Sequence, residues 1–107
     1  MRRGQIRQGD VLLVHADESE LTAQYTEVEA DAQGRLVLAE GEATGHVHAV
    51  PAVAAALYVA QTMMLLRVHE ATRLEHEEHA WIDLDPGLYR VVRQREYYQT
   101  EIRRVTD

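Results

Sequence analysis

Short runs of strand-forming residues, each introduced by a turn signal, constrain the fold of this chain more than any other feature. Gln8-Gly9-Asp10 leads into the run 11–15, and the turn-forming stretch 31–34 leads into the run 35–39. A further run of strand formers follows Gly45. Val, Ile, Leu and aromatic residues bounded by Gly, Asp and Pro are typical of strands separated by tight turns. The pattern therefore favours many short strands over helices.

The second half of the chain continues this pattern. Asp85-Pro86-Gly87 separates the run 80–84 from the run 88–93, and we expect a β-hairpin there because Pro and Gly suit the two central positions of a turn. The segment 63–73 fits a strand better than a helix, because it has β-branched residues and no N-terminal capping box. The segment 18–29 is ambiguous.

About seven or eight such strands in 107 residues predict an all-β fold, a small barrel or sandwich. We expect one domain spanning residues 1–107, with an irregular tail from about residue 99. The apolar stretch Val50 to Leu66 is at the lower length limit for a membrane span and is interrupted by polar residues, so we expect it in the sheet core. Trp81 and Tyr58 are expected to anchor that core.

Composition limits the chemistry that is available. The sequence has no cysteine, which excludes disulfides, thiolate metal sites and thiol nucleophiles. Eighteen acidic residues against 11 basic ones give a net charge of −7, which argues against nucleic acid as a partner. The N-terminus has no apolar segment typical of a secretory signal, so we expect a cytoplasmic protein.

The histidines are the main candidates for metal binding or catalysis in this chain. His46 and His48 are one residue apart, so on a strand both rings point to one face, with Cα atoms roughly 6 to 7 Å apart. The second pair lies in Glu75-His76-Glu77-Glu78-His79, where carboxylates surround the imidazoles. Imidazole and carboxylate ligands suit a divalent transition metal, namely zinc, iron, manganese, nickel or copper, without choosing among them.

Other catalytic motifs do not fit the spacing. A zincin needs two histidines at i and i+4, whereas His76 and His79 are at i and i+3. Ser19 is the only serine, and it lies in an acidic turn rather than in a nucleophile elbow. The stretch 41–45 has two glycines but lacks the Lys-Ser/Thr pair of a phosphate-binding loop.

The His-x-His strand after a Gly-bounded loop, together with the later histidine cluster, resembles the metal site of cupin-type β-barrels. The resemblance implies a three-histidine site made of His46, His48 and one of His76 or His79, with the other histidine or a carboxylate as a fourth ligand. Ala52 and Val53 stand where a cupin usually has its glutamate ligand. The same motifs are also similar to those of small uncharacterised bacterial proteins, and that similarity implies no function.

The sequence thus predicts a small metal-binding protein, which would be an enzyme if the metal keeps an open coordination position. Glu78 or Glu42 would then move protons or orient a ligand. Arg93 and Arg95, on one face of the last strand, would either hold a small anionic substrate or lie on a solvated face and pair with nearby acids.

Two alternatives stay open. One is a metal-free binding or interaction module that uses a sheet edge or the acidic stretch 17–42. The other is an interaction domain whose histidines respond to pH. In either case the edge strands of a small β domain favour a homodimer.

Overall fold

The computed structural model describes residues 5–41 and 45–93, and this part of the chain contains ten strands, two short 3-10 helices and no α-helix. The all-β prediction is confirmed, but the sheets do not close into a barrel. The 3-10 helices are η1 (Glu18–Glu20) and η2 (Ala52–Ala54). The strands are β1 (Ile6–Gln8), β2 (Val11–His15), β3 (Thr26–Val28), β4 (Arg35–Glu40), β5 (Val47–Pro51), β6 (Ala55–Ala60), β7 (Met63–Val68), β8 (Thr72–Leu74), β9 (Ile82–Leu84) and β10 (Gly87–Arg93).

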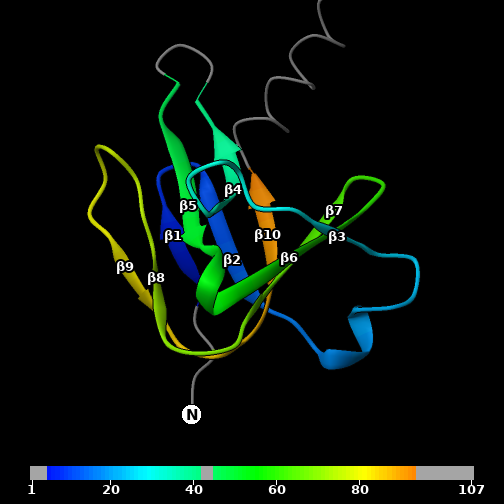
Figure 1. Cartoon of the computed structure of the whole chain (residues 1–107). Helices are drawn as coiled ribbons and strands as arrows, with labels where there is room; N and C mark the ends of the chain where they lie inside the picture. Colours follow the sequence, from blue (N-terminus) through cyan, green and yellow to red (C-terminus); the bar gives the residue numbers. More distant parts are fainter. Residues whose placement is uncertain (1–4, 42–44, 94–107) are drawn as a thin grey trace, which may run out of the picture.

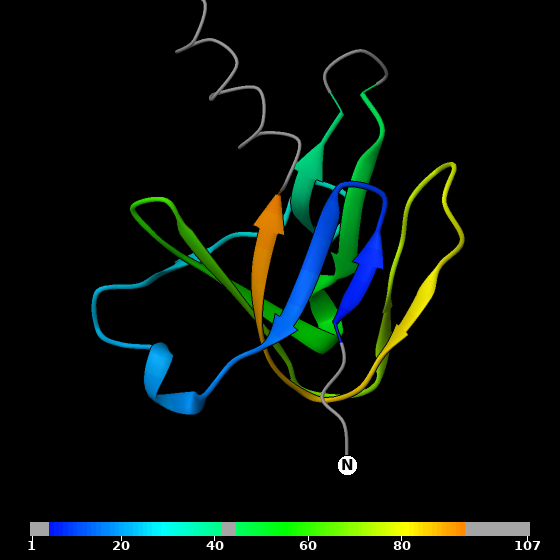
Figure 2. The same cartoon turned by 180° about the vertical axis from the view of Figure 1, so that it is seen from behind.

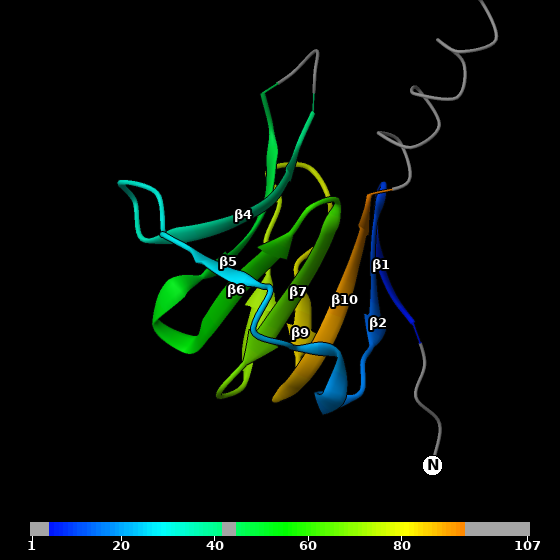
Figure 3. The same ribbon diagram turned by 90° about the vertical axis from the view of Figure 1, so that its right-hand side faces the viewer.

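Six strands form one antiparallel sheet in the order β1-β2-β10-β7-β6-β3, while β4–β5 and β8–β9 form two separate ribbons (Figure 1). Seen from the side, the β4–β5 ribbon stands apart from β10 and β2 (Figure 3). Apolar side chains from the sheet and from both ribbons meet in one core cluster, which includes Leu13, Leu38, Leu74 and Leu84. The fold is therefore a sheet with two ribbons packed against it.

The hairpin predicted around Asp85-Pro86-Gly87 is wrong. β9 pairs with β8, whereas β10 pairs with β2 on one side and β7 on the other. The turn residues bend the chain as expected, but burial decides the partners: Leu88, Tyr89 and Val91 are at most 7% exposed, so β10 is a central strand. A central strand must hydrogen-bond on both edges.

Among the residues that the structure describes, the aromatic residue of the core is Tyr89, not Trp81 or Tyr58. Tyr89 is 1% exposed and its hydroxyl donates a hydrogen bond to the Asp85 carbonyl oxygen at 2.7 Å. Tyr58 is half-buried on β6, and the Trp81 side chain is 58% exposed. The prediction that Trp81 anchors the core is therefore wrong, because it lies just before β9 at the rim of the molecule.

The remaining local predictions are mostly confirmed. The segment 63–73 forms β7 and the start of β8, and the ambiguous segment 18–29 contains η1 and β3. The stretch Val50 to Leu66 contributes much of the core, although Val53 and Met63 are exposed at turns. Within residues 5–41 and 45–93, no helix is long and apolar enough to cross a membrane. The tail predicted from residue 99 lies outside the described residues.

Candidate metal centre

Two segments about thirty residues apart meet at one end of the molecule. Ala49 on β5 and Glu75 after β8 form an antiparallel bridge, with reciprocal N–H···O bonds of 3.0 and 2.8 Å. In an antiparallel register, one step from this bridge places His48 opposite His76. The β8–β9 loop, which carries the second histidine pair, therefore lies beside the start of β5 (Figure 1).

The structure brings all four histidines of the two pairs together. The His76 ring centroid lies 4.3 Å from that of His48, 4.6 Å from that of His79 and 5.7 Å from that of His46. The His48 and His79 rings stack with centroids 5.9 Å apart. His46, His76 and Glu77 can each offer one ligand atom within 4.8 Å of the others. His76 is the centre of the cluster.

Burial keeps the central rings neutral. His48 is 6% exposed, and this burial, helped by the charges that His76 and His79 would carry, lowers its pKa to about 4. The pKa of His76 is lowered by the same two effects, burial first and the neighbouring His79 second. At neutral pH both imidazoles are therefore uncharged, which is the form that binds a metal ion.

Carboxylates stand around the rings. Glu77 accepts a hydrogen bond from the Val47 backbone N–H at 2.9 Å, which lowers the pKa of its carboxyl group. Glu78 Oε2 lies 3.4 Å from His46 Nδ1. Glu78 is thus beside the cluster, as the sequence predicts, whereas Glu42 lies outside the described residues.

One ring nitrogen of His76 is hydrogen-bonded to backbone groups of its own loop. Its Nδ1 accepts hydrogen bonds from the backbone N–H groups of Glu78 at 2.9 Å and His79 at 3.1 Å. In a neutral imidazole that accepts at Nδ1, the proton is on Nε2. A metal bound through Nε2 would require the proton to move and these two bonds to break.

The β1–β2 turn forms the floor of the cluster. Gly9 has a φ of +58°, and a Cβ atom at this position would lie 2.6 Å from His79 Nε2 and 3.3 Å from His48 Cε1. A two-residue hairpin turn that starts with such a glycine has the type II′ pattern. The turn lies at the same end of the molecule as the β8–β9 loop (Figure 2).

Gln8, which precedes this turn, was not singled out by the sequence. It is 2% exposed. Its side-chain amide contacts His48 Nδ1 at 2.8 Å and the backbone carbonyl oxygens of Leu74 at 3.0 Å and Ala80 at 2.9 Å. A single glutamine on a strand carries no sequence signal for this role, because its partners are 40 to 72 residues away.

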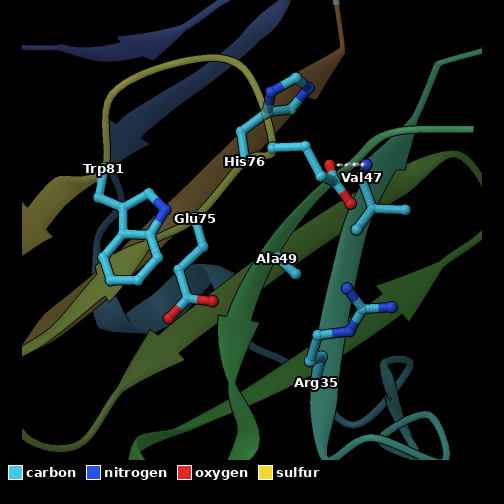
Figure 4. A pocket seen from close by; sticks show the side chains of 7 residues that line it. Arg35, Val47, Ala49, Glu75, His76 and Trp81 are labelled. Atoms are coloured by element: carbon cyan, nitrogen blue, oxygen red, sulfur yellow. Dashed lines mark hydrogen bonds between the residues drawn. The ribbon is translucent and has the colours of Figure 1, made fainter. Parts of the chain in front are cut away.

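A pocket of about 210 Å³ opens beside the cluster. Figure 4 shows the Arg35 guanidinium and the Trp81 indole on opposite sides of it, with His76 between them at one end. Asp31 holds Arg35 through Nε at 3.0 Å and Nη2 at 3.0 Å. The lining residues are Arg35, Val47, Ala49, Glu75, His76, Glu77 and Trp81.

Arg93, one of the two predicted anion-binding arginines, does not line this pocket. Arg93 is opposite Val11 in the β10–β2 register, at the end of the sheet that carries the β1–β2 turn. Arg95 lies outside the described residues. The cation in the pocket is Arg35, and no motif in the sequence distinguishes it from the other arginines.

No curated protein and no solved structure matches the chain significantly. A family model described as "Domain of unknown function (DUF8820)" matches residues 7–94. The matched region includes Gln8, Gly9, the four clustered histidines and the pocket. The chain therefore belongs to the DUF8820 family.

Proposed function

We propose that this protein binds one divalent transition-metal ion in the cluster of His46, His48, His76 and His79, with Glu77 as an additional ligand. The observation that carries the proposal is the central position of His76, whose ring contacts three other histidine rings. Four imidazoles gathered from two segments give each other little stabilisation as neutral rings. A cation would join them if the ligand atoms of His48 and His79 moved in toward those of His46, His76 and Glu77. Two neighbouring carboxylates add negative charge.

The metal-free arrangement is close to a binding geometry but does not have it. With metal–nitrogen bonds of about 2.0 Å, ligand atoms around a tetrahedral ion lie about 3.3 Å apart. The candidate atoms of His46, His76 and Glu77 lie within 4.8 Å of one another. Binding would therefore draw the β8–β9 loop inward and exchange the two backbone hydrogen bonds at His76 Nδ1 for a metal bond.

We further propose that the bound metal serves a small anionic ligand in the adjacent pocket, as substrate or as effector. His76 and Glu77 belong to both the cluster and the pocket wall, so a ligand in the pocket reaches the metal. The Arg35 guanidinium, held in place by Asp31, suits a carboxylate or phosphate group. Trp81 offers an apolar wall to the same pocket.

The charges of the pocket favour an anion only after the metal binds. Glu75 is paired with Arg73 at 2.8 Å, and Arg73 also covers the Trp81 ring at 4.5 Å. Glu77 would be neutralised by the metal. A ligand carboxylate would then meet Arg35 and the cation, whereas a metal-free interaction module, the alternative function, would bind the same anion equally well with or without metal.

The proposal is tested by elemental analysis and metal titration of protein purified without a histidine tag. We expect about one transition-metal ion per chain and a higher melting temperature with metal, because an ion at 100 times its Kd stabilises the folded state by about 2.7 kcal/mol. The variant His46→Ala/His48→Ala should lose this uptake, and His69→Ala, an exposed histidine after β7, should keep it. Equal uptake by both variants, or a parent that takes up none of the five metals, would refute the proposal.

The anionic ligand is tested separately. Metal-loaded parent should bind a small aromatic carboxylate saturably in isothermal titration, and Arg35→Gln should weaken that binding without changing metal content. Binding that is unaffected by Arg35→Gln would remove the pocket from the proposal. A cytoplasmic location and a homodimer remain predictions, the second open to sedimentation analysis.

A further inference from the structure

We infer that Gln8 is the positioning residue of this centre: its side-chain amide fixes His48 with Nδ1 protonated, so that the Nε2 lone pair is left for the metal, and ties both ends of the β8–β9 loop. The inference rests on the proposed metal site for its function. The part that concerns which ring nitrogen of His48 carries the proton depends only on the hydrogen bonds of Gln8, not on the metal.

Counting donors and acceptors fixes the orientation of the amide. Gln8 Nε2 lies 3.0 Å from the Leu74 carbonyl oxygen and 2.9 Å from the Ala80 carbonyl oxygen. Carbonyl oxygens only accept hydrogen bonds, so these two partners use both N–H groups of the amide. A flipped amide would place its oxygen against two other oxygens.

The remaining amide atom then fixes the histidine. Gln8 Oε1 lies 2.8 Å from His48 Nδ1, and an amide oxygen can only accept. His48 Nδ1 must therefore carry the proton, and in the neutral ring Nε2 has the lone pair. His48 is 6% exposed and Gln8 2%, so water offers little alternative to this bond.

The same amide sets the position of the opposite ligands. Leu74 ends β8, and Ala80 follows the His76-Glu77-Glu78-His79 segment. Gln8 therefore holds both ends of that segment while it orients His48 on β5. Proteins usually orient a ligating histidine through a residue that accepts a hydrogen bond from the N–H of its second nitrogen.

A glutamine that only held the loop could pair its buried side-chain oxygen with any donor. The third contact, to a ring inside the histidine cluster, links the strand before the β1–β2 turn to the ligand set. Replacing this amide should thus change the state of His48 and not only the stability of the loop.

The first test is a ¹⁵N–¹H correlation spectrum of the metal-free parent with labelled histidine, at neutral pH with chelator. We expect His48 as the Nδ1–H tautomer. Gln8→Met should lose this preference, because methionine offers the His48 Nδ1–H only a weak acceptor. Gln33→Leu, at an exposed glutamine, is the control and should match the parent.

The second test is metal affinity by chelator competition. We expect Gln8→Met to bind metal roughly 10- to 100-fold more weakly than the parent, as for other residues that support ligands. An Nε2–H tautomer in the parent, or a Gln8→Met protein with an unchanged tautomer and an affinity within about twofold of the parent, would overturn the inference.

The two proposals fail in different ways. If the parent binds no metal, the proposed function fails, and the tautomer measurement on metal-free protein still decides what Gln8 does. If the parent binds metal but His48 is the Nε2–H tautomer, only the role of Gln8 falls. Should Gln8→Met not fold, the tautomer of His48 in the parent spectrum decides.

Discussion

Replacing Gly9 by alanine should damage the metal centre far more than it damages the fold. The residue has a φ of +58°, and a left-handed backbone costs an L-residue about 1–2 kcal/mol. The added Cβ would also lie 2.6 Å from His79 Nε2 and 3.3 Å from His48 Cε1. A normal carbon–nitrogen contact is about 3.5 Å, so the His79 ring must move by about 1 Å.

The two costs fall on different properties. The His79 side chain is exposed, so its ring can move without strain in the core and stability should fall only by the backbone term. Metal–ligand distances tolerate about 0.2 Å, so a displacement of about 1 Å should remove His79 as a ligand and disturb His48. We expect metal affinity to fall by at least tenfold, since each lost ligand or support costs about 10- to 100-fold.

Gly34→Ala is the matched control. Gly34 has a φ of +77°, and a Cβ there would meet nothing within 4 Å. Urea unfolding with chelator should therefore give similar losses, about 1–2 kcal/mol, for both variants, while competition titration should show weakened metal binding for Gly9→Ala alone. Equal metal affinity in the two variants would refute the placement of the β1–β2 turn under the histidines.

Two further predictions concern stability. Burial lowers the pKa of His48 to about 4, so between pH 6.5 and 4 only the unfolded chain takes up a proton at this residue. The free energy of unfolding of the metal-free protein should therefore fall by up to about 3 kcal/mol as the pH falls through this range. The charges of His76 and His79 also lower the pKa of His48, whereas those of Asp10 and Glu77 raise it. If a His48→Gln variant shows the same pH dependence in urea unfolding, His48 is not the cause of the lost stability. Leu13→Ala, at a fully buried position, should cost about 2–5 kcal/mol, whereas the 86% exposed Val53 should tolerate alanine within about 0.5 kcal/mol, as thermal and urea unfolding can check.

Local chemistry carried the correct predictions of the fold. Turn residues and β-branched runs depend on neighbours in the sequence, and the strands after Gly9 and Gly34 begin where those signals place them. The Asp85-Pro86-Gly87 turn shows the limit of this reasoning. It bends the chain, but which strands pair with β10 depends on burial across the whole sheet.

The candidate site divides in the same way. The four histidines could be found because two close pairs in one small domain are unusual, and the Ala49–Glu75 bridge then brings them into contact. Gln8 and Arg35 could not be found, because a buried amide and a pocket cation are defined by partners that only the fold supplies. Aromatic residues usually lie in the core, but Trp81 stands just before β9 and is exposed there.

The central claim is that the clustered imidazoles are the metal ligands, and X-ray absorption spectroscopy of the metal-loaded protein tests it most directly. The chain has no cysteine, so thiolate sulfur cannot be among the neighbours of the metal. We expect metal–nitrogen and metal–oxygen distances of about 2.0–2.1 Å, together with scattering from the more distant atoms of at least two imidazole rings. This imidazole scattering should decrease in His46→Ala/His48→Ala. A shell of oxygen alone, without imidazole scattering, would contradict the account.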